Sequence, residues 1–86
     1  MSVLVLDGEL TIYRAAELKK LLVDAVAAGG RVDVDLGQVS ALDSAGVQLL
    51  LLARAAARAK EIPIAFSGHS PVVVEVLELL GLRGDL

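Results

Sequence analysis

The segment Arg31–Leu36 alternates strictly between charged and apolar residues, which predicts a β-strand with one buried face and one polar face. Its polar face carries Asp33 and Asp35, so one side of the sheet is expected to be only partly covered. A run rich in Ala and Leu, from Ala45 to about Lys60, comes soon afterwards and favours a long helix. A strand followed closely by a helix is the repeating unit of α/β folds, and this stretch therefore predicts an α/β chain.

Strand and helix patterns alternate along the rest of the chain as well. The expected strands and helices, in chain order, are Val3–Leu6, Tyr13–Ala28, Arg31–Leu36, Ala45–Lys60, Ile62–Phe66 and a last helix that starts at Pro71 and ends before Gly81. Because Val3–Leu6 is apolar at every position, it is expected to be covered on both faces. The order predicts one small α/β domain over residues 1–86, with a mainly parallel sheet of three or four strands and three helices.

Local signals mark the ends of these elements and the core face of the longest helix. Gly29 is the expected residue after the first helix, and Ser70 before Pro71 is a typical helix start. The segment Gly8–Thr11 is expected to be a bend or bulge. On the second helix, helical spacing assigns the core contacts to Leu49, Leu52, Ala53 and Ala56. A second stripe, apolar at first and basic further on, contains Val47, Leu51, Arg54 and Arg58.

The composition argues against several kinds of function. The 86 residues carry a net charge of −3 at pH 7, with acids and bases interspersed, which argues against nucleic acid as a main partner. The absence of cysteine excludes disulfides, thiolate metal sites and cysteine nucleophiles. The first residues lack the basic segment of a signal peptide, and no apolar run is long enough to span a bilayer. We therefore expect a cytoplasmic protein that is not inserted in a membrane.

The turn Asp43-Ser44-Ala45-Gly46 has two interpretations. As structure, Asp43 and Ser44 are preferred N-cap residues that start the long helix. As a site, they follow the carboxyl end of a parallel strand, where ligands and switches gather, and a phosphate on Ser44 would add about −1.5 to −2 charges. Such a charge would repel an acidic or apolar partner surface. The only histidine, His69, lies on another predicted loop, so Ser44 has no base to activate it, and we expect no enzyme, metal or cofactor.

The residues around this turn belong to a recognisable pattern. The stretch Val34–Val47, with Leu42-Asp43-Ser44-Ala45-Gly46 near its end, resembles the signature of STAS domains, the family of bacterial anti-sigma factor antagonists. Gly8-Glu9-Leu10 matches the first motif of that family, and the segment from Ser70 to Leu82 matches its last helix. The resemblance covers nearly the whole chain.

The resemblance implies a non-enzymatic protein that switches between partners. Ser44 would be phosphorylated by a cognate anti-sigma factor that is also a serine kinase, and a serine phosphatase would reset it. The unphosphorylated form would bind that kinase and free the sigma factor. Helical spacing after Ser44 adds a docking face beside it, and the expected partner-binding residues are Asp43, Ser44, Gly46, Val47, Gln48 and Leu51.

The chain also departs from the family pattern. Thr11 stands where an acid is typical, and Arg14 stands where a Ser or Thr cap is typical. The extra edge strand at the start of typical members, and the last strand and helix of longer ones, are nearly absent, which predicts a homodimer or a partner that completes the sheet. Two alternative functions remain open: a non-phosphorylated STAS accessory subunit of a lipid-transport ABC system, and a nucleotide- or anion-binding domain that uses the same loop.

Overall fold

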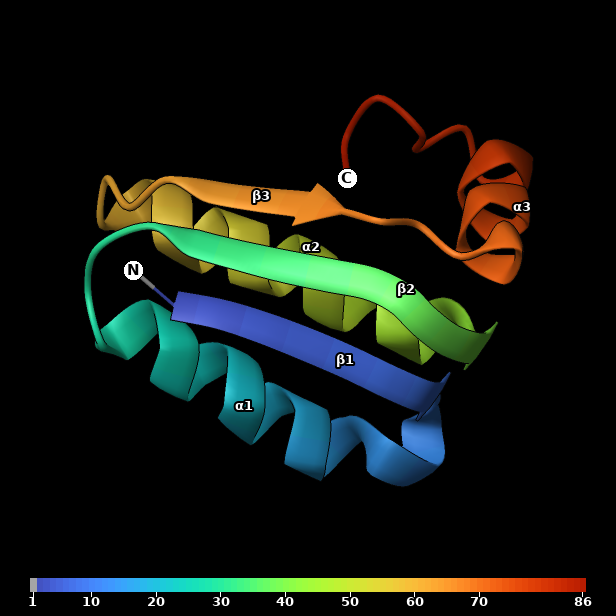
Figure 1. Cartoon of the computed structure of the whole chain (residues 1–86), viewed down its shortest axis with the longest axis horizontal. Helices are drawn as coiled ribbons and strands as arrows, with labels where there is room; N and C mark the ends of the chain where they lie inside the picture. The colour runs from blue at the N-terminus through green and yellow to red at the C-terminus, as the bar shows by residue number, and fades with distance from the viewer. Residues whose placement is uncertain (1) are drawn as a thin grey trace.

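Three parallel strands form the sheet in the computed structural model, which describes residues 2–86 (Figure 1). In chain order the elements are β1 (Ser2–Leu10), a short 3₁₀ helix η1 (Ile12–Arg14), α1 (Ala15–Ala27), β2 (Val32–Leu42), α2 (Ser44–Ala59), β3 (Ile64–Ser67) and α3 (Pro71–Leu79). The long strand β2 lies in the middle and pairs in parallel with β1 on one side and β3 on the other. The predicted α/β architecture with alternating strands and helices is confirmed.

The helices are distributed unevenly around this sheet. α1 and α2 lie on one face, whereas α3 lies beyond the carboxyl ends of the strands (Figure 1). The core fills the space between the sheet and the two long helices, and its fully buried side chains include Leu6, Leu10, Leu18, Val32, Val34, Leu36 and Leu50. Val73 and Leu77 of α3 close the end of this core. No helix within residues 2–86 has both the length and the hydropathy to cross a membrane.

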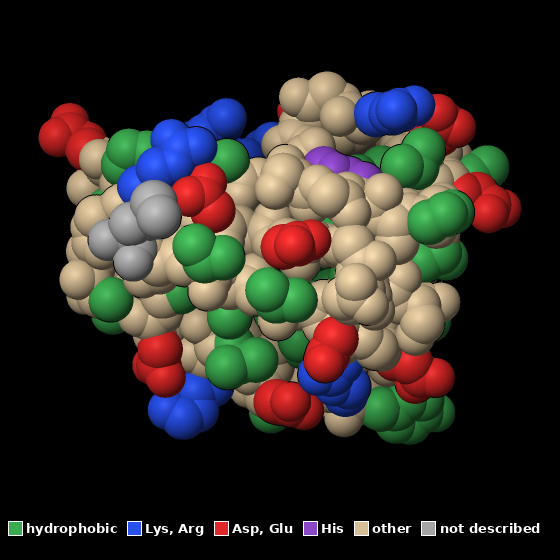
Figure 2. Space-filling view, viewed as in Figure 1, with side chains coloured by type: hydrophobic (Ala, Val, Ile, Leu, Met, Phe, Trp, Pro, Cys, Tyr) green, Lys and Arg blue, Asp and Glu red, His purple; other side chains and the backbone are tan. Residues whose placement is uncertain are grey.

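The other face of the sheet is open to solvent. Val3 and Val5 of β1 are 64% and 52% exposed, so the prediction that this strand is covered on both faces is wrong. The expectation that the Asp33 and Asp35 side of the sheet is only partly covered is confirmed, because these residues pair with Val3 and Val5 and are half-buried. Figure 2 shows this face, on which apolar and acidic side chains are intermixed.

Strand β2 continues well beyond the predicted end at Leu36. Its register with β1 shifts twice, between Val5 and Asp7 and between Gly8 and Glu9, so β2 carries extra residues at these bulges. The bulges let residues three apart, Leu36, Val39 and Leu42, all point into the core. A spacing of three does not match the strand period of two, which is why the sequence pattern indicated a loop here.

The buried face of α2 is rotated from the predicted one. Leu52 is 60% exposed and Ala56 is exposed, although both were expected in the core. Ala53 is buried as predicted, and the other buried residues of α2 are Gly46, Val47, Leu50 and Ala57. The start of α2 sets this rotation, because Gly46 lies against Leu10 of β1 and Leu42 of β2, and Val47 beside it is buried.

The ends of the other helices follow the sequence signals. Gly29 has a φ of +77° directly after the last turn of α1, as expected for a helix-terminating glycine. The Ser70 hydroxyl accepts a hydrogen bond from the Val73 N–H, which confirms Ser70 as the cap of α3. The same hydroxyl donates to the carbonyl oxygen of Val39 at 2.7 Å, so the start of α3 is bound to the carboxyl-terminal half of β2.

Candidate functional site

Asp43 joins three segments at the carboxyl end of the sheet. One of its carboxylate oxygens accepts a hydrogen bond from the Gly46 N–H at 2.9 Å, which confirms Asp43 as the N-cap of α2. The other oxygen accepts from the Ile12 N–H at 3.0 Å, and the Asp43 N–H donates to the Leu10 carbonyl. Hydrogen bonds from the Gly46 and Ile12 amides hold the pKa of Asp43 below its usual value. This carboxylate therefore stays ionised while it holds η1 against the start of α2.

Gly46 allows α2 to approach β1 closely. A Cβ atom at this position would lie 2.2 Å from the carbonyl oxygen of Leu10 and 2.8 Å from a methyl group of Leu42. Gly46, one of the predicted partner-binding residues, is buried, and its lack of a side chain lets the helix pack against the backbone. Val47, another of the predicted partner-binding residues, is only 3% exposed and belongs to the core.

Ser44 is exposed at the first position of α2. Gln48, one helical turn later, is also exposed and lies on the same side of the helix, whereas Leu51 is half-buried. Of the predicted docking residues, the structure thus leaves Ser44 and Gln48 fully accessible, with Asp43 and Leu51 partly accessible. Their role in partner binding stays a prediction.

Two exposed apolar residues lie beside this site and were missed from the sequence. Ile12, whose N–H binds Asp43, is 62% exposed, and its neighbour Tyr13 is 93% exposed. We call Ile12, Tyr13, Ser44 and Gln48 together the Ser44 surface. The helical pattern assigned Tyr13 to the first helix. In the structure Thr11 makes no side-chain capping hydrogen bond, and a 3₁₀ turn precedes α1, as is frequent at helix N-termini.

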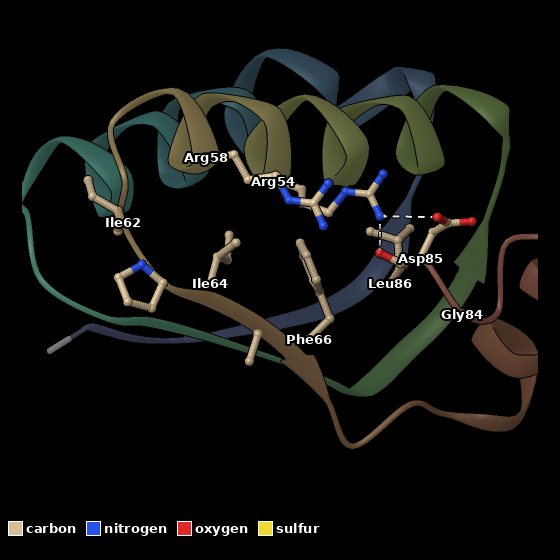
Figure 3. A pocket seen from close by; sticks show the side chains of 10 residues that line it. Arg54, Arg58, Ile62, Ile64, Phe66, Gly84, Asp85 and Leu86 are labelled. Carbon is tan, nitrogen blue, oxygen red and sulfur yellow. Dashed lines mark hydrogen bonds and ion pairs between the residues drawn. The ribbon is translucent and has the colours of Figure 1, made fainter.

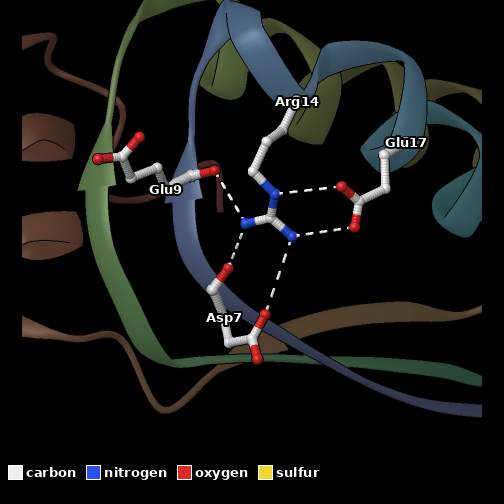
Figure 4. A network of polar contacts seen from close by, with 4 residues as sticks. All are labelled: Asp7, Glu9, Arg14 and Glu17. Atoms are coloured by element: carbon white, nitrogen blue, oxygen red, sulfur yellow. Dashed lines mark hydrogen bonds and ion pairs between the residues drawn. The ribbon is translucent and has the colours of Figure 1, made fainter.

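Arg14 stabilises the bulged end of β1 next to the Ser44 surface (Figure 4). Its guanidinium group donates to the backbone carbonyls of Asp7 and Glu9 and forms a bidentate ion pair with the Glu17 carboxylate. The side-chain hydrogen bond from Arg14 lowers the pKa of Glu17. Arg14 stands at the N-cap of α1 without a side-chain capping hydrogen bond, and its guanidinium group instead holds the carbonyls of the segment that leads to η1.

His69 has its ring Nε2 3.2 Å from the carbonyl oxygen of Leu86 and is half-buried. Within residues 2–86 there is no group of three or more His, Cys, Asp or Glu side chains placed to hold a metal ion. At the start of α2 the Gly46 N–H, which could bind an external anion, is already bound by Asp43.

Comparisons with known proteins agree with this geometry. A family model described as "Mlab, STAS domain" matches residues 1–86. Among solved structures, the anti-sigma factor antagonist SpoIIAA in its unphosphorylated form matches with a TM-score of 0.77 and 25% sequence identity. The match covers 95% of this chain and 73% of that chain. A search of curated proteins found no match. The chain therefore belongs to the STAS domain family.

Proposed function

We propose that this chain is an anti-sigma factor antagonist that binds its partner through the Ser44 surface and releases it when Ser44 is phosphorylated. The observation that carries the proposal is the exposed hydroxyl of Ser44 beside the Asp43 cap, at the carboxyl end of the central strand. The likeness to SpoIIAA, an anti-sigma factor antagonist described in its unphosphorylated form, supports the same role for this chain.

The electrostatics of the Asp43 cap suit a switch of this kind. Asp43 is ionised, so a phosphate on Ser44 would join a negative charge that is already present. The phosphate adds about −1.5 to −2 charges, and the helix dipole tolerates this charge in the folded domain. Phosphorylation would therefore alter the surface that a partner meets and leave the fold intact. An acidic or apolar partner surface would be repelled.

The Ser44 surface also offers a partner apolar contacts. Tyr13 and Ile12 are exposed on η1, and aromatic side chains are enriched among residues that dominate binding energy. Gln48 and Leu51 continue the surface along α2. The proposed partners are an anti-sigma factor with serine kinase activity and a serine phosphatase. The chain itself would be no enzyme, since its histidine contacts Leu86 and not Ser44.

The test is phosphosite mapping. The purified chain is incubated with ATP and, in turn, with each anti-sigma factor kinase of its native host, and the modified residue is identified by mass spectrometry. A single phosphate on Ser44, absent from Ser44→Ala, is the expected result. Labelling that persists in Ser44→Ala, or no labelling by any kinase that binds the chain, would contradict the phospho-switch.

A second candidate is a STAS accessory subunit that is never phosphorylated. The observation that favours it is the family model itself, which is that of the Mlab STAS domain and not of an anti-sigma factor antagonist. In this case Ser44 would be an interface residue, and stable binding to a transporter subunit would persist in the presence of kinase and ATP. A nucleotide-binding role is less favoured, because Asp43 already binds the Gly46 amide. A rise in the Tm of the chain on addition of nucleotides would support the nucleotide-binding role.

A further inference from the structure

A groove of about 450 Å³ runs between α2 and β3, away from the Ser44 surface (Figure 3). Its apolar wall contains Ile62, Ile64 and Phe66. Arg54 and Arg58 of α2 direct their guanidinium groups into it (Figure 3). Arg54 lies about 15 Å along α2 from Ser44, so the groove is a separate surface.

The outer edge of β3 in this groove is unpaired. Within residues 2–86, β3 is the last strand of the sheet and pairs only with β2. The Val32 N–H donates to the Pro63 carbonyl, and Val32 is the register partner of Ile64. In a parallel ladder with this register, Ile64 and Phe66 direct their N–H and C=O groups away from β2, toward the groove. The edge can therefore bind a further extended segment through its backbone.

The spacing of the two arginines matches a strand laid along this edge. Arg54 and Arg58 are four residues apart in α2, which separates them by about 6 Å along the helix axis. Side chains on one face of an extended strand repeat about every 6.7 Å. Two acidic residues at alternate positions of an added strand would therefore face the two guanidinium groups.

The chain itself contains one contact between an acidic residue and an arginine of this groove. Asp85, at the rim of the groove, places its carboxylate 3.5 Å from Arg54, and its carbonyl accepts a hydrogen bond from the same guanidinium group (Figure 3). Arg54 is 20% exposed in its side chain, so this pair is partly shielded from water. Arg58 is exposed and makes no ion pair within the described residues. The position beside Arg54 thus already holds an acidic group, and the position beside Arg58 holds none within the described residues.

We propose that the β3 edge is a second docking site, which binds an extended partner segment with acidic residues at alternate positions. The segment adds a strand beside β3, its backbone pairs with Ile64 and Phe66, and its carboxylates face Arg54 and Arg58. The groove acts independently of phosphorylation at Ser44 and would let the domain hold a second partner, or a second part of the same one.

The test uses a fluorescein-labelled, end-capped peptide that alternates Val and Glu. Fluorescence anisotropy should show saturable binding to the full chain, and hydrogen exchange should show slowed amides at Ile64 and Phe66. Arg58→Glu, an exposed site whose change leaves the core intact, should weaken binding about tenfold. Asp85→Ala should strengthen binding about threefold, because it removes the internal competitor for Arg54. Ser44→Asp should bind the peptide like the wild type, which separates this site from the proposed switch.

Three results would overturn the proposal. The first is that a control peptide that alternates Val and Lys binds as tightly as the peptide that alternates Val and Glu. The second is that the Ile64 and Phe66 amides exchange at the same rate with and without peptide. The third result is that the free protein sediments as a dimer in which these amides are already protected. This result would show that a second copy occupies the edge.

Discussion

The Asp43 carboxylate accepts a hydrogen bond from the Ile12 N–H, 31 residues earlier in the chain, at 3.0 Å. This contact links the cap of α2 to η1, so the phosphoacceptor candidate Ser44 and the exposed residues Ile12 and Tyr13 share one rigid support. The same carboxylate caps the helix through Gly46. Asp43 is therefore expected to matter for the shape of the Ser44 surface as well as for the stability of the fold.

Asp43→Asn should lower the stability of the domain in a pH-dependent way. Because the folded-state pKa of Asp43 is depressed, its contribution is present above the unfolded-state value of about 3.9 and is lost as the pH falls through the lower folded value. An Asn side chain has one acceptor oxygen in place of the two that bind the Gly46 and Ile12 N–H groups, so the Tm of the variant should be about 5 °C below the wild type at pH 7. The difference should shrink at pH 3. Thermal unfolding at both pH values measures this. A constant difference would contradict the ionised cap. Glu75→Gln, at an exposed position of α3, is the control.

Gly46→Ala should destabilise the fold by about 2–3 kcal/mol, because the added Cβ would lie 2.2 Å from the Leu10 carbonyl oxygen. Urea unfolding measures the loss. Gly84→Ala is the matched control, since a Cβ there meets nothing within 4 Å, and its stability should stay close to that of the wild type. Equal stabilities of the two variants would mean that α2 does not need this close approach.

Arg14→Lys should loosen the end of β1. A lysine cannot bind two backbone carbonyls and the Glu17 carboxylate together, so hydrogen exchange should speed up at Glu9 and Leu10. Lys20→Ala removes an exposed pair with Asp24 on α1 and should leave these amides unchanged. Unchanged hydrogen-exchange rates at Glu9 and Leu10 in Arg14→Lys would show that Arg14 does not stabilise this end of β1.

Tyr13→Ala should weaken partner binding about tenfold or more without changing the Tm, because its side chain is 93% exposed and contributes little to the core. Tyr13→Phe should retain most of the affinity if the ring supplies the contact. Isothermal titration with the anti-sigma partner measures both. Unchanged affinity in Tyr13→Ala would remove η1 from the docking surface.

The sequence predicted the order of elements, the N-caps Asp43 and Ser70, and the helix-terminating Gly29, because these three residues act through local backbone geometry. The sequence pattern did not predict the features of the fold that depend on tertiary packing between distant segments. The bulges of β1 against β2 bring Leu36 and Leu42 to the same face, and no local period encodes them.

The candidate site was predicted in part for the same reason. Ser44 and Gln48 are exposed as expected, but Val47 is buried because its helix approaches β1 at Gly46. The hydrogen bond between Ile12 and Asp43 joins segments 31 residues apart and could not be predicted from residue spacing alone.

The most direct test is the affinity of the anti-sigma partner for the chain with and without a phosphate on Ser44. Isothermal titration would compare the unmodified chain, the enzymatically phosphorylated chain, Ser44→Ala and Ser44→Asp. The unmodified chain and Ser44→Ala should bind alike, while the phosphorylated chain and Ser44→Asp should bind at least about tenfold more weakly. Equal affinity of all four forms would contradict the proposed switch.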